Sequence, residues 1–168
     1  MRSKGLLLLG LTLVGFPLLS EEVGVVNEIS PSPGVLFGGQ PTAEQLDALA
    51  ASGYKTVLDL RGVNEDRGFD EAAVARRAGL TYLPVPVTGE TMAQAETFDQ
   101  FIRHFKQAEK PMLVHCASGG RVGALYYAWL VASEKMPREQ ALEEAKDNSH
   151  ASDALFQRVD LFLDGKLE

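Results

Sequence analysis

The sequence around the single cysteine reads VHCASGGRVG at residues 114–123. The apolar residues 111–114 precede it and predict a buried strand. Residues 121–134 follow it with the composition of a helix, and the two glycines between them are typical of a tight turn. Cys116 is therefore expected to open a short loop between a strand and a helix.

This loop has the composition of an anion-binding site. Glycines and small residues leave backbone N–H groups free to turn inward, next to the positive end of the following helix dipole. A helix start and nearby cations favour the reactive thiolate of a cysteine, and an arginine has donors spaced for two phosphate oxygens. We expect Cys116 to be a nucleophile. The predicted phosphate-binding residues are Ala117, Ser118, Gly119, Gly120 and Arg121.

Strands and helices alternate along the rest of the chain. Short apolar runs predict strands at residues 35–37, 55–60, 80–85 and 111–114. Helical spacing and caps predict helices at residues 43–51, 68–78, 93–109, 121–134, 138–146 and 152–164. This order predicts one α/β domain whose mainly parallel central sheet is covered by helices on both faces.

The loop resembles that of the protein tyrosine and dual-specificity phosphatase superfamily, whose signature is His-Cys, five residues, then Arg. Only four residues separate Cys116 from Arg121 here. A four-residue spacing also occurs in rhodanese-type sulfurtransferases, where the loop holds a persulfide. The loop alone is thus compatible with both families.

Upstream residues favour one branch of the phosphatases. Residues 36–46 read LFGGQPTAEQL and residues 53–61 read GYKTVLDLR. Both stretches resemble the bacterial phosphatase-like domain of the beta-lactamase hydrolase-like type, a form also fused to NAD kinase in plants. Members of that branch carry His-Cys-Arg-Ser-Gly-x-Arg, with the same four-residue spacing. The resemblance covers residues 35–134. It implies a cysteine phosphatase-like fold and an enzyme that hydrolyses phosphate monoesters through a phosphocysteine.

Two positions depart from the phosphatase pattern. Val122 stands where phosphatases place a Ser or Thr that stabilises the leaving thiolate. The general acid of the pattern is an aspartate after the strand at residues 82–87, and Glu90 is the nearest carboxylic acid there. Asp59 and Asp66 are reserve candidates for the acid. We assign His115 and Asp59 a supporting role at the strand ends.

Three functions stay open at this point. The first is a cysteine-dependent phosphatase acting on a phosphorylated small molecule or protein. The second is a sulfurtransferase that carries a persulfide on Cys116. The third is a non-catalytic module that binds a phosphorylated or sulfated ligand. No cofactor is expected, and neither His104 nor His150 has the spacing of a metal ligand, so no metal site is predicted.

The N-terminus has the pattern of a secretory signal. Two basic residues precede an apolar run that is too short to span a bilayer easily, and Ser20 is a small residue at a plausible cleavage site. We expect a signal peptide at residues 1–20, an extended approach at 21–34 and the phosphatase-like domain at 35–168. The mature protein would be periplasmic, with no stable membrane span; an uncleaved segment that tethers it to the membrane is the alternative.

The charge of the chain bears on its partners. The formal net charge is −7, and loss of Arg2 and Lys4 with the leader would make it −9. Such a surface repels polyanions, so nucleic acid is not an expected partner. An anionic substrate must then be recognised locally, at the loop that ends in Arg121.

Overall fold

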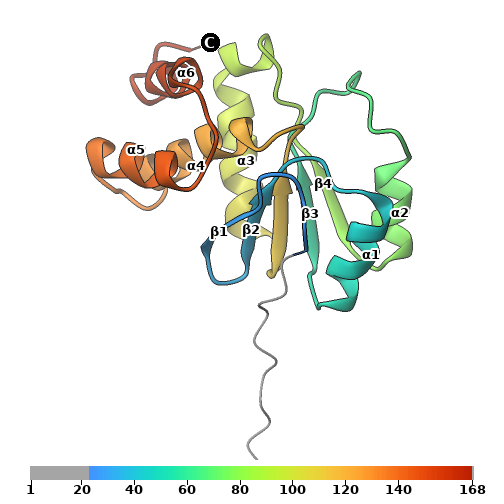
Figure 1. The fold of residues 1–168 in the computed structure, drawn as a ribbon. Coiled ribbons are helices and arrows are strands. Elements are labelled where there is room, and N and C mark those ends of the chain that lie inside the picture. The colour runs from blue at the N-terminus through green and yellow to red at the C-terminus, as the bar shows by residue number, and fades with distance from the viewer. Residues whose placement is uncertain (1–22, 168) are drawn as a thin grey trace, which may run out of the picture.

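The computed structural model describes residues 23–167 and shows a five-stranded sheet in the order β1-β2-β5-β3-β4 (Figure 1). β1 runs antiparallel to β2, and all other neighbouring strands are parallel. The strands are β1 (Ile29–Ser32), β2 (Val35–Gly38), β3 (Thr56–Asp59), β4 (Thr81–Pro84) and β5 (Met112–His115). The predicted α/β fold with a mainly parallel sheet is confirmed.

Helices lie on both faces of the sheet, as predicted (Figure 1). The first face is covered by α1 (Ala43–Ala51) and α2 (Glu71–Arg77). The second carries a short 3-10 turn, η1 (Thr91–Ala93), with α3 (Ala95–Gln107) and α4 (Gly120–Ala132). Outside them, α5 (Arg138–Asp147) and α6 (Asp153–Leu163) pack against α4.

Alternation along the strands divides the core in two. Val57 and Leu113 pack under α1 and α2, whereas Leu58 and Val114 belong to the larger core under α3–α6. Successive side chains of a strand point to opposite faces. Asp59 lies two residues after Val57, and His115 lies two residues after Leu113, so both point toward the α2 face. They are direct partners in the register of β3 and β5.

The starts of α1 and α2 follow capping residues. The predicted capping box of α1 is present, because Thr42 and Gln45 exchange side-chain and backbone hydrogen bonds. α2 begins at Glu71, three residues later than predicted, since Gly68 has a φ of +70° and Asp70 caps the helix. The delayed start lengthens the loop after β3, which runs along the carboxyl ends of the strands.

The N-terminal part of the described chain is tied to the sheet. β1 lies within the segment 21–34 and forms an edge strand. Before it, the Glu28 carboxylate accepts hydrogen bonds from the N–H groups of Val23, Gly24 and Val25, at 2.7–3.2 Å. The predicted signal peptide lies outside the described residues. Within residues 23–167, no helix is long and apolar enough to cross a membrane.

Candidate active site

Cys116 lies at the carboxyl end of β5, immediately before the loop that leads into α4. Its side chain is buried, and its Sγ accepts a hydrogen bond from the N–H of Gly119 at 3.1 Å. Gly119 has a φ of +90°, in the left-handed region that favours glycine. The loop therefore bends back so that its own backbone faces the sulfur.

The carbonyls of the loop are bound from outside. Ala117 O accepts the N–H of Gln40 at 3.1 Å, and Ser118 O accepts Asn27 Nδ2 at 2.9 Å. A trans peptide directs its N–H opposite to its carbonyl, so the next N–H groups turn toward the side of the sulfur. Gly39 allows this approach, because a Cβ there would lie 2.8 Å from Ala117 O. This contact gives the Gly-Gly-Gln motif at residues 38–40 a structural role.

Arg121 lies in the first turn of α4 and is held by two other segments, the loop after β3 and the residues after β4. Its Nη1 and Nη2 atoms bind the two carboxylate oxygens of Glu65, with Nη2 at 2.7 Å from Oε2. Nη1 also donates to the backbone oxygen of Val87 at 2.8 Å. Hydrogen bonding to Arg121 holds the pKa of Glu65 below its usual value. The guanidinium thus has a defined direction, and it is only 18% exposed.

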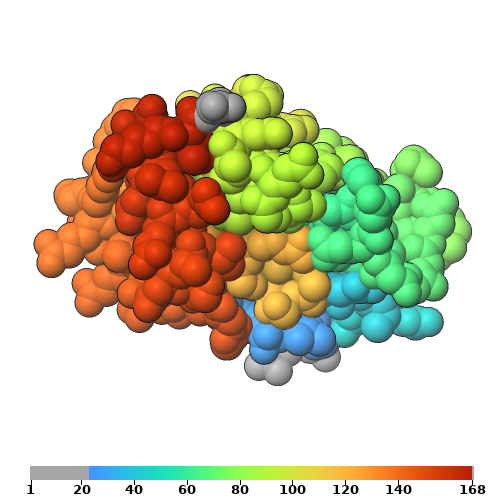
Figure 2. Space-filling model, turned by 90° about the horizontal axis from the view of Figure 1, so that it is seen from above, coloured from blue at the N-terminus to red at the C-terminus, as the bar shows by residue number. Residues whose placement is uncertain are grey.

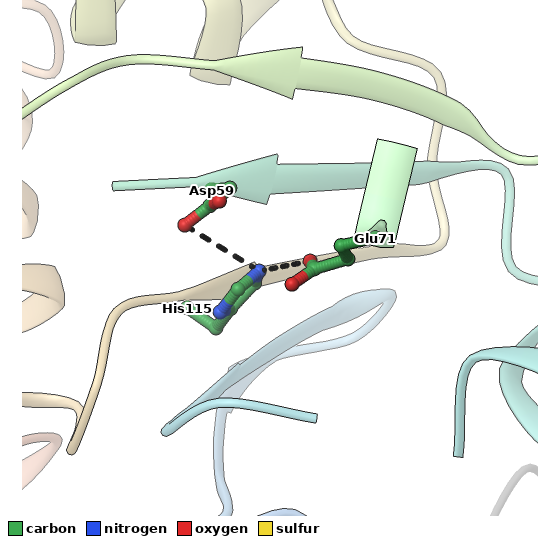
Figure 3. Close-up of side chains that lie close together, drawn as sticks. All are labelled: Asp59, Glu71 and His115. Atoms are coloured by element: carbon green, nitrogen blue, oxygen red, sulfur yellow. Dashed lines mark ion pairs between the residues drawn. The ribbon is translucent and has the colours of Figure 1, made fainter. Parts of the chain in front are cut away.

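A buried ionic cluster lies beneath the loop on the α2 face (Figure 3). His115 Nε2 lies 2.8 Å from a Glu71 oxygen and 3.8 Å from Asp59 Oδ1, and all three side chains are fully buried. The separation of His115 and Glu71 is that of an ion pair, although their geometry is not that of a well-aligned hydrogen bond. On the other side of its ring, His115 Nδ1 lies 3.3 Å from Cys116 O. His115 therefore connects the cluster to the loop.

Asp59, Glu71 and His115 have the residue types of a metal site, and their candidate ligand atoms lie within 4.8 Å of one another. The buried guanidinium of Arg61 binds both carboxylates, with Nε at 2.9 Å from Asp59 Oδ1. Arg67 adds a second guanidinium, which lies 3.1 Å from Asp59, so two cations already pair with the two carboxylates. The cluster is consequently explained as an ion-pair network without a metal.

Asp59 is the most connected member of this cluster. It also accepts hydrogen bonds from Arg67 at 3.1 Å and from the Tyr82 hydroxyl at 2.6 Å. Burial raises the pKa of Asp59, but the hydrogen bonds of Arg61 and Tyr82 and the charge of His115 outweigh it, so the pKa lies well below its usual value. A carboxylate that stays ionised and enclosed suits support of the site better than proton donation.

The other two candidate acids are exposed. Asp66 accepts the N–H of Gly68 at 2.7 Å and so closes a local turn. Glu90 precedes η1 and lines a hollow of about 460 Å³. One wall of this hollow is residues 62–65, including the Glu65 that binds Arg121. Of the two, only Glu90 faces a hollow shared with the Arg121 partner.

Several segments surround the loop. Figure 2 shows the segment around residue 120 at the centre of the upper face, with segments around residues 27, 65, 90 and 150 about it. The last of these packs closely on α4: a Cβ on Gly123 would lie 1.9 Å from Ser149 Oγ. Val122 is fully buried, and its apolar side chain offers the loop no hydroxyl.

Some site residues are not apparent from the sequence. Glu65, Glu71 and Asn27 have no motif of their own, because their partners are 44 to 91 residues away in the chain. The usable signal for Glu65 is its place in a loop that follows a buried strand, since ligands of parallel sheets bind at the carboxyl ends of strands. The remaining predicted loop residues follow Cys116 in one short loop, in which the N–H of Gly119 contacts the Cys116 sulfur.

Comparison with known proteins identifies the family. The family model of a DSP-PTPase phosphatase fused to NAD+ kinase matches residues 22–159. A beta-lactamase hydrolase-like protein of Xylella fastidiosa (strain Temecula1) is 37% identical over 121 residues, which are 70% of this chain and 27% of that protein. The chain thus spans about a quarter of the length of this curated relative.

Solved structures agree on the fold. Tk-PTP in its active form has a TM-score of 0.68 at 23% identity, over 83% of this chain and 95% of that one. A DUF442 protein of Shewanella putrefaciens CN-32 has a TM-score of 0.66 at 20% identity, over 86% and 96% of the two chains. With the family match and the cysteine-centred loop, these results show that the chain belongs to the DSP-PTPase phosphatase family whose members include domains fused to NAD+ kinase.

Proposed function

We propose that this protein is a cysteine-dependent phosphatase that hydrolyses phosphate monoesters. The observation that carries the proposal is the loop at residues 116–121, where the N–H of Gly119 donates to the buried Cys116 sulfur and the loop leads directly to Arg121, whose guanidinium is fixed by Glu65. Such an arrangement stabilises negative charge as it develops on a transferred phosphoryl group. Family membership supports the same reaction class.

In the proposed reaction, the Cys116 thiolate attacks phosphorus and forms an S–P bond while the bond to the leaving oxygen breaks. The N–H groups of residues 117–121 and the Nε edge of Arg121 bind the other phosphate oxygens, because Glu65 occupies the Nη1–Nη2 edge. Glu90 protonates the leaving oxygen. Water then attacks the phosphocysteine, which releases phosphate and restores the thiolate.

Replacement of the nucleophile tests this mechanism. We expect Cys116→Ser to abolish turnover of an aryl phosphate but to keep binding of inorganic phosphate, because the N–H groups and Arg121 remain. Release of phosphate from the substrate and a phosphate titration would be measured on the full chain under reducing conditions. Undiminished turnover by Cys116→Ser would refute the mechanism. A wild-type protein that binds phosphate without turnover would instead be a binding module, to which the buried Val122 lends support.

A second variant tests the acid. Glu90→Gln is expected to slow an alkyl phosphate by about 10²-fold or more, and an activated aryl phosphate much less, because a good leaving group needs no proton. The matched control is Glu96→Gln, an equally exposed glutamate on α3 that does not line the hollow. Equal slowing of both substrates would exclude Glu90 as the acid.

The substrate proposed here is a phosphorylated small molecule or protein. The hollow between residues 62–65 and the segment Pro86–Thr91 adjoins the Arg121 partner Glu65 and has room for the alcohol part of such a substrate. Its charged lining residues are Glu65 and Glu90. Hydrolysis rates for a panel of neutral, cationic and further phosphorylated alcohols would define the class, and we expect further phosphorylated alcohols to be poor substrates.

A further inference from the structure

Asn27 belongs to the turn before β1, yet its side chain reaches the phosphate loop. Its Nδ2 donates to Ser118 O at 2.9 Å, across 91 residues of chain. The backbone of Asn27 has a φ of 54°, in the left-handed region that asparagine tolerates better than most residues. The carbonyl of the preceding Val26 accepts the N–H of Gly39 at 2.6 Å. The turn is therefore anchored beside the loop at two points.

The hydrogen bond of Asn27 acts on one particular peptide unit. The carbonyl of Ser118 and the N–H of Gly119 belong to the same planar trans peptide, so they point in opposite directions. That N–H is the group that donates to Cys116 Sγ at 3.1 Å. A donor that fixes the carbonyl on the outer side of the loop thereby fixes the N–H on the side of the sulfur.

This peptide differs from the peptide before it in how its carbonyl is held, although Ser118 also forms an isolated β-bridge with Gly39. Ala117 O is held by the backbone N–H of Gln40, next to the start of α1. The carbonyl of Ser118 is held by a side chain instead, and the peptide is followed by Gly119, which lacks the Cβ that limits rotation in other residues. The orientation of the Gly119 N–H is therefore held by the β-bridge of Ser118 with Gly39 and the start of α4, together with a side-chain group that one substitution removes.

We propose that Asn27 is a positioning residue of the phosphate loop, which holds the Ser118–Gly119 peptide with its N–H directed at the Cys116 sulfur and at a bound phosphate. This inference rests on the proposed phosphatase function and adds to it a residue outside the family signature. It gives the turn before β1 a role in positioning the phosphate loop, in addition to leading the chain into the sheet.

Two substitutions separate the side chain from the turn. Asn27→Gly removes the donor but keeps a residue suited to a positive φ, so the turn remains. Asn27→Asp keeps shape and size but places a carboxylate oxygen against Ser118 O. We expect phosphate to bind in the order wild type, Gly, Asp, with a loss of about fivefold for Asn27→Gly and more than tenfold for Asn27→Asp.

Three readouts on the full chain test the order. They are the inhibition constant of inorganic phosphate, kcat/KM for an aryl phosphate, and the rate at which iodoacetamide alkylates Cys116 at fixed pH. We expect all three to change in the same order while the melting temperature stays nearly constant, since Asn27 is exposed. Gln140→Glu, an exposed amide-to-carboxylate change on α5, is the control for added charge and should match the wild type.

The outcomes test the role of Asn27 separately from the proposed phosphatase function. Wild-type values for Asn27→Gly in all three readouts would overturn the positioning role, and so would a lowered melting temperature with unchanged phosphate binding. A wild-type protein that neither hydrolyses aryl phosphates nor binds phosphate would defeat the proposed function instead. The alkylation rates would still report on Asn27 in that case, because they need no substrate.

Discussion

Glu65 decides which edge of Arg121 is available to a ligand. The carboxylate binds both Nη atoms, and the N–H of Gly62 donates to the same carboxylate at 2.7 Å. An arginine that binds phosphate through two parallel hydrogen bonds needs a fixed guanidinium plane. At the scale of single residues, we therefore expect the site to depend on a carboxylate that fixes Arg121 as well as lining the hollow beside it.

Glu65→Gln tests this dependence. An amide keeps one acceptor but loses the paired geometry, so the guanidinium plane is less defined. We expect kcat/KM for an aryl phosphate to fall about tenfold, the equivalent of one charge-assisted hydrogen bond. Steady-state kinetics would be compared with Glu139→Gln, an exposed glutamate on α5. A rise in kcat/KM would show that the carboxylate competes with phosphate rather than positioning Arg121.

Asp59 is expected to stabilise the fold over an unusually wide pH range. Its pKa is lower in the folded state than the ordinary 3.8, so its contribution is complete above that value and is lost as the pH falls through the folded pKa. Asp59→Asn removes the carboxylate charge that pairs with both Arg61 and Arg67, so that Arg61 keeps only Glu71, and should lower the free energy of unfolding by about 3 kcal/mol at neutral pH. Urea unfolding at several pH values measures this difference. A difference that disappears between pH 7 and pH 5 would contradict the assignment.

Residues of the site differ in how far the sequence reveals them. Only four residues separate Cys116 from Arg121, so local spacing predicts their proximity. Asp59 and His115 end two buried strands, and their pairing follows once the strands are neighbours. Glu71 and Asn27 reach the site only through tertiary contacts. Their contacts depend on where α2 and the turn before β1 dock, which no local pattern encodes.

At the scale of elements, α4 and the segment after α5 meet at a glycine. Gly123 lies on α4 where Ser149 approaches it, so a methyl group has no space. Gly123→Ala should improve helix propensity by up to about 1 kcal/mol, but overpacking of this contact should cost about 1–3 kcal/mol. We therefore expect net destabilisation in thermal unfolding.

The control for this substitution is Gly89→Ala. Gly89 lies in a loop where an added Cβ would meet no atom within 4 Å, and we expect its melting temperature to match the wild type. If Gly123→Ala were as stable as Gly89→Ala, the close packing of residues 149–151 on α4 would be disproved. Both variants are judged by stability alone, which keeps the comparison independent of activity.

Element boundaries were predictable where caps and periodicity coincide. Thr42 and Gln45 mark the start of α1, and the apolar runs mark each parallel strand. The predicted start of α2 at residue 68 is wrong, because Gly68 has a positive φ and Asp70 caps the helix that begins at Glu71. The order of the strands in the sheet cannot be predicted from local sequence, since it depends on how the helices that connect the strands pack on the sheet.

At the scale of the whole molecule, burial raises the pKa of all four tyrosine side chains. Burial is the main cause that raises the pKa of Tyr54, Tyr82, Tyr126 and Tyr127, and for Tyr126 and Tyr127 the value reaches about 12. The fold therefore binds phenolic protons more tightly than the unfolded chain does. The resulting stability is complete below pH 10 and is lost as the pH rises through about 12.

Alkaline titration measures this effect directly. Near-ultraviolet absorbance of the native protein should show little phenolate at pH of about 11, whereas the chain in urea should titrate near the ordinary value of about 10. Stability to urea should decline over the same range of pH. Phenolate formation near pH 10 in the native protein would show that these side chains are more accessible than the structure has them.

The central position of β5 has a consequence for how the chain matures. β5 lies between β2 and β3, although it is the last strand to be synthesised. Before residues 112–115 leave the ribosome, β1–β2 and β3–β4 can form only separate ribbons with unpaired edges, which are prone to intermolecular association. Closure of the sheet and arrival of Cys116 are thus a single event. A nascent chain that is released earlier lacks both the central strand and Cys116, so every completed fold already contains the proposed nucleophile.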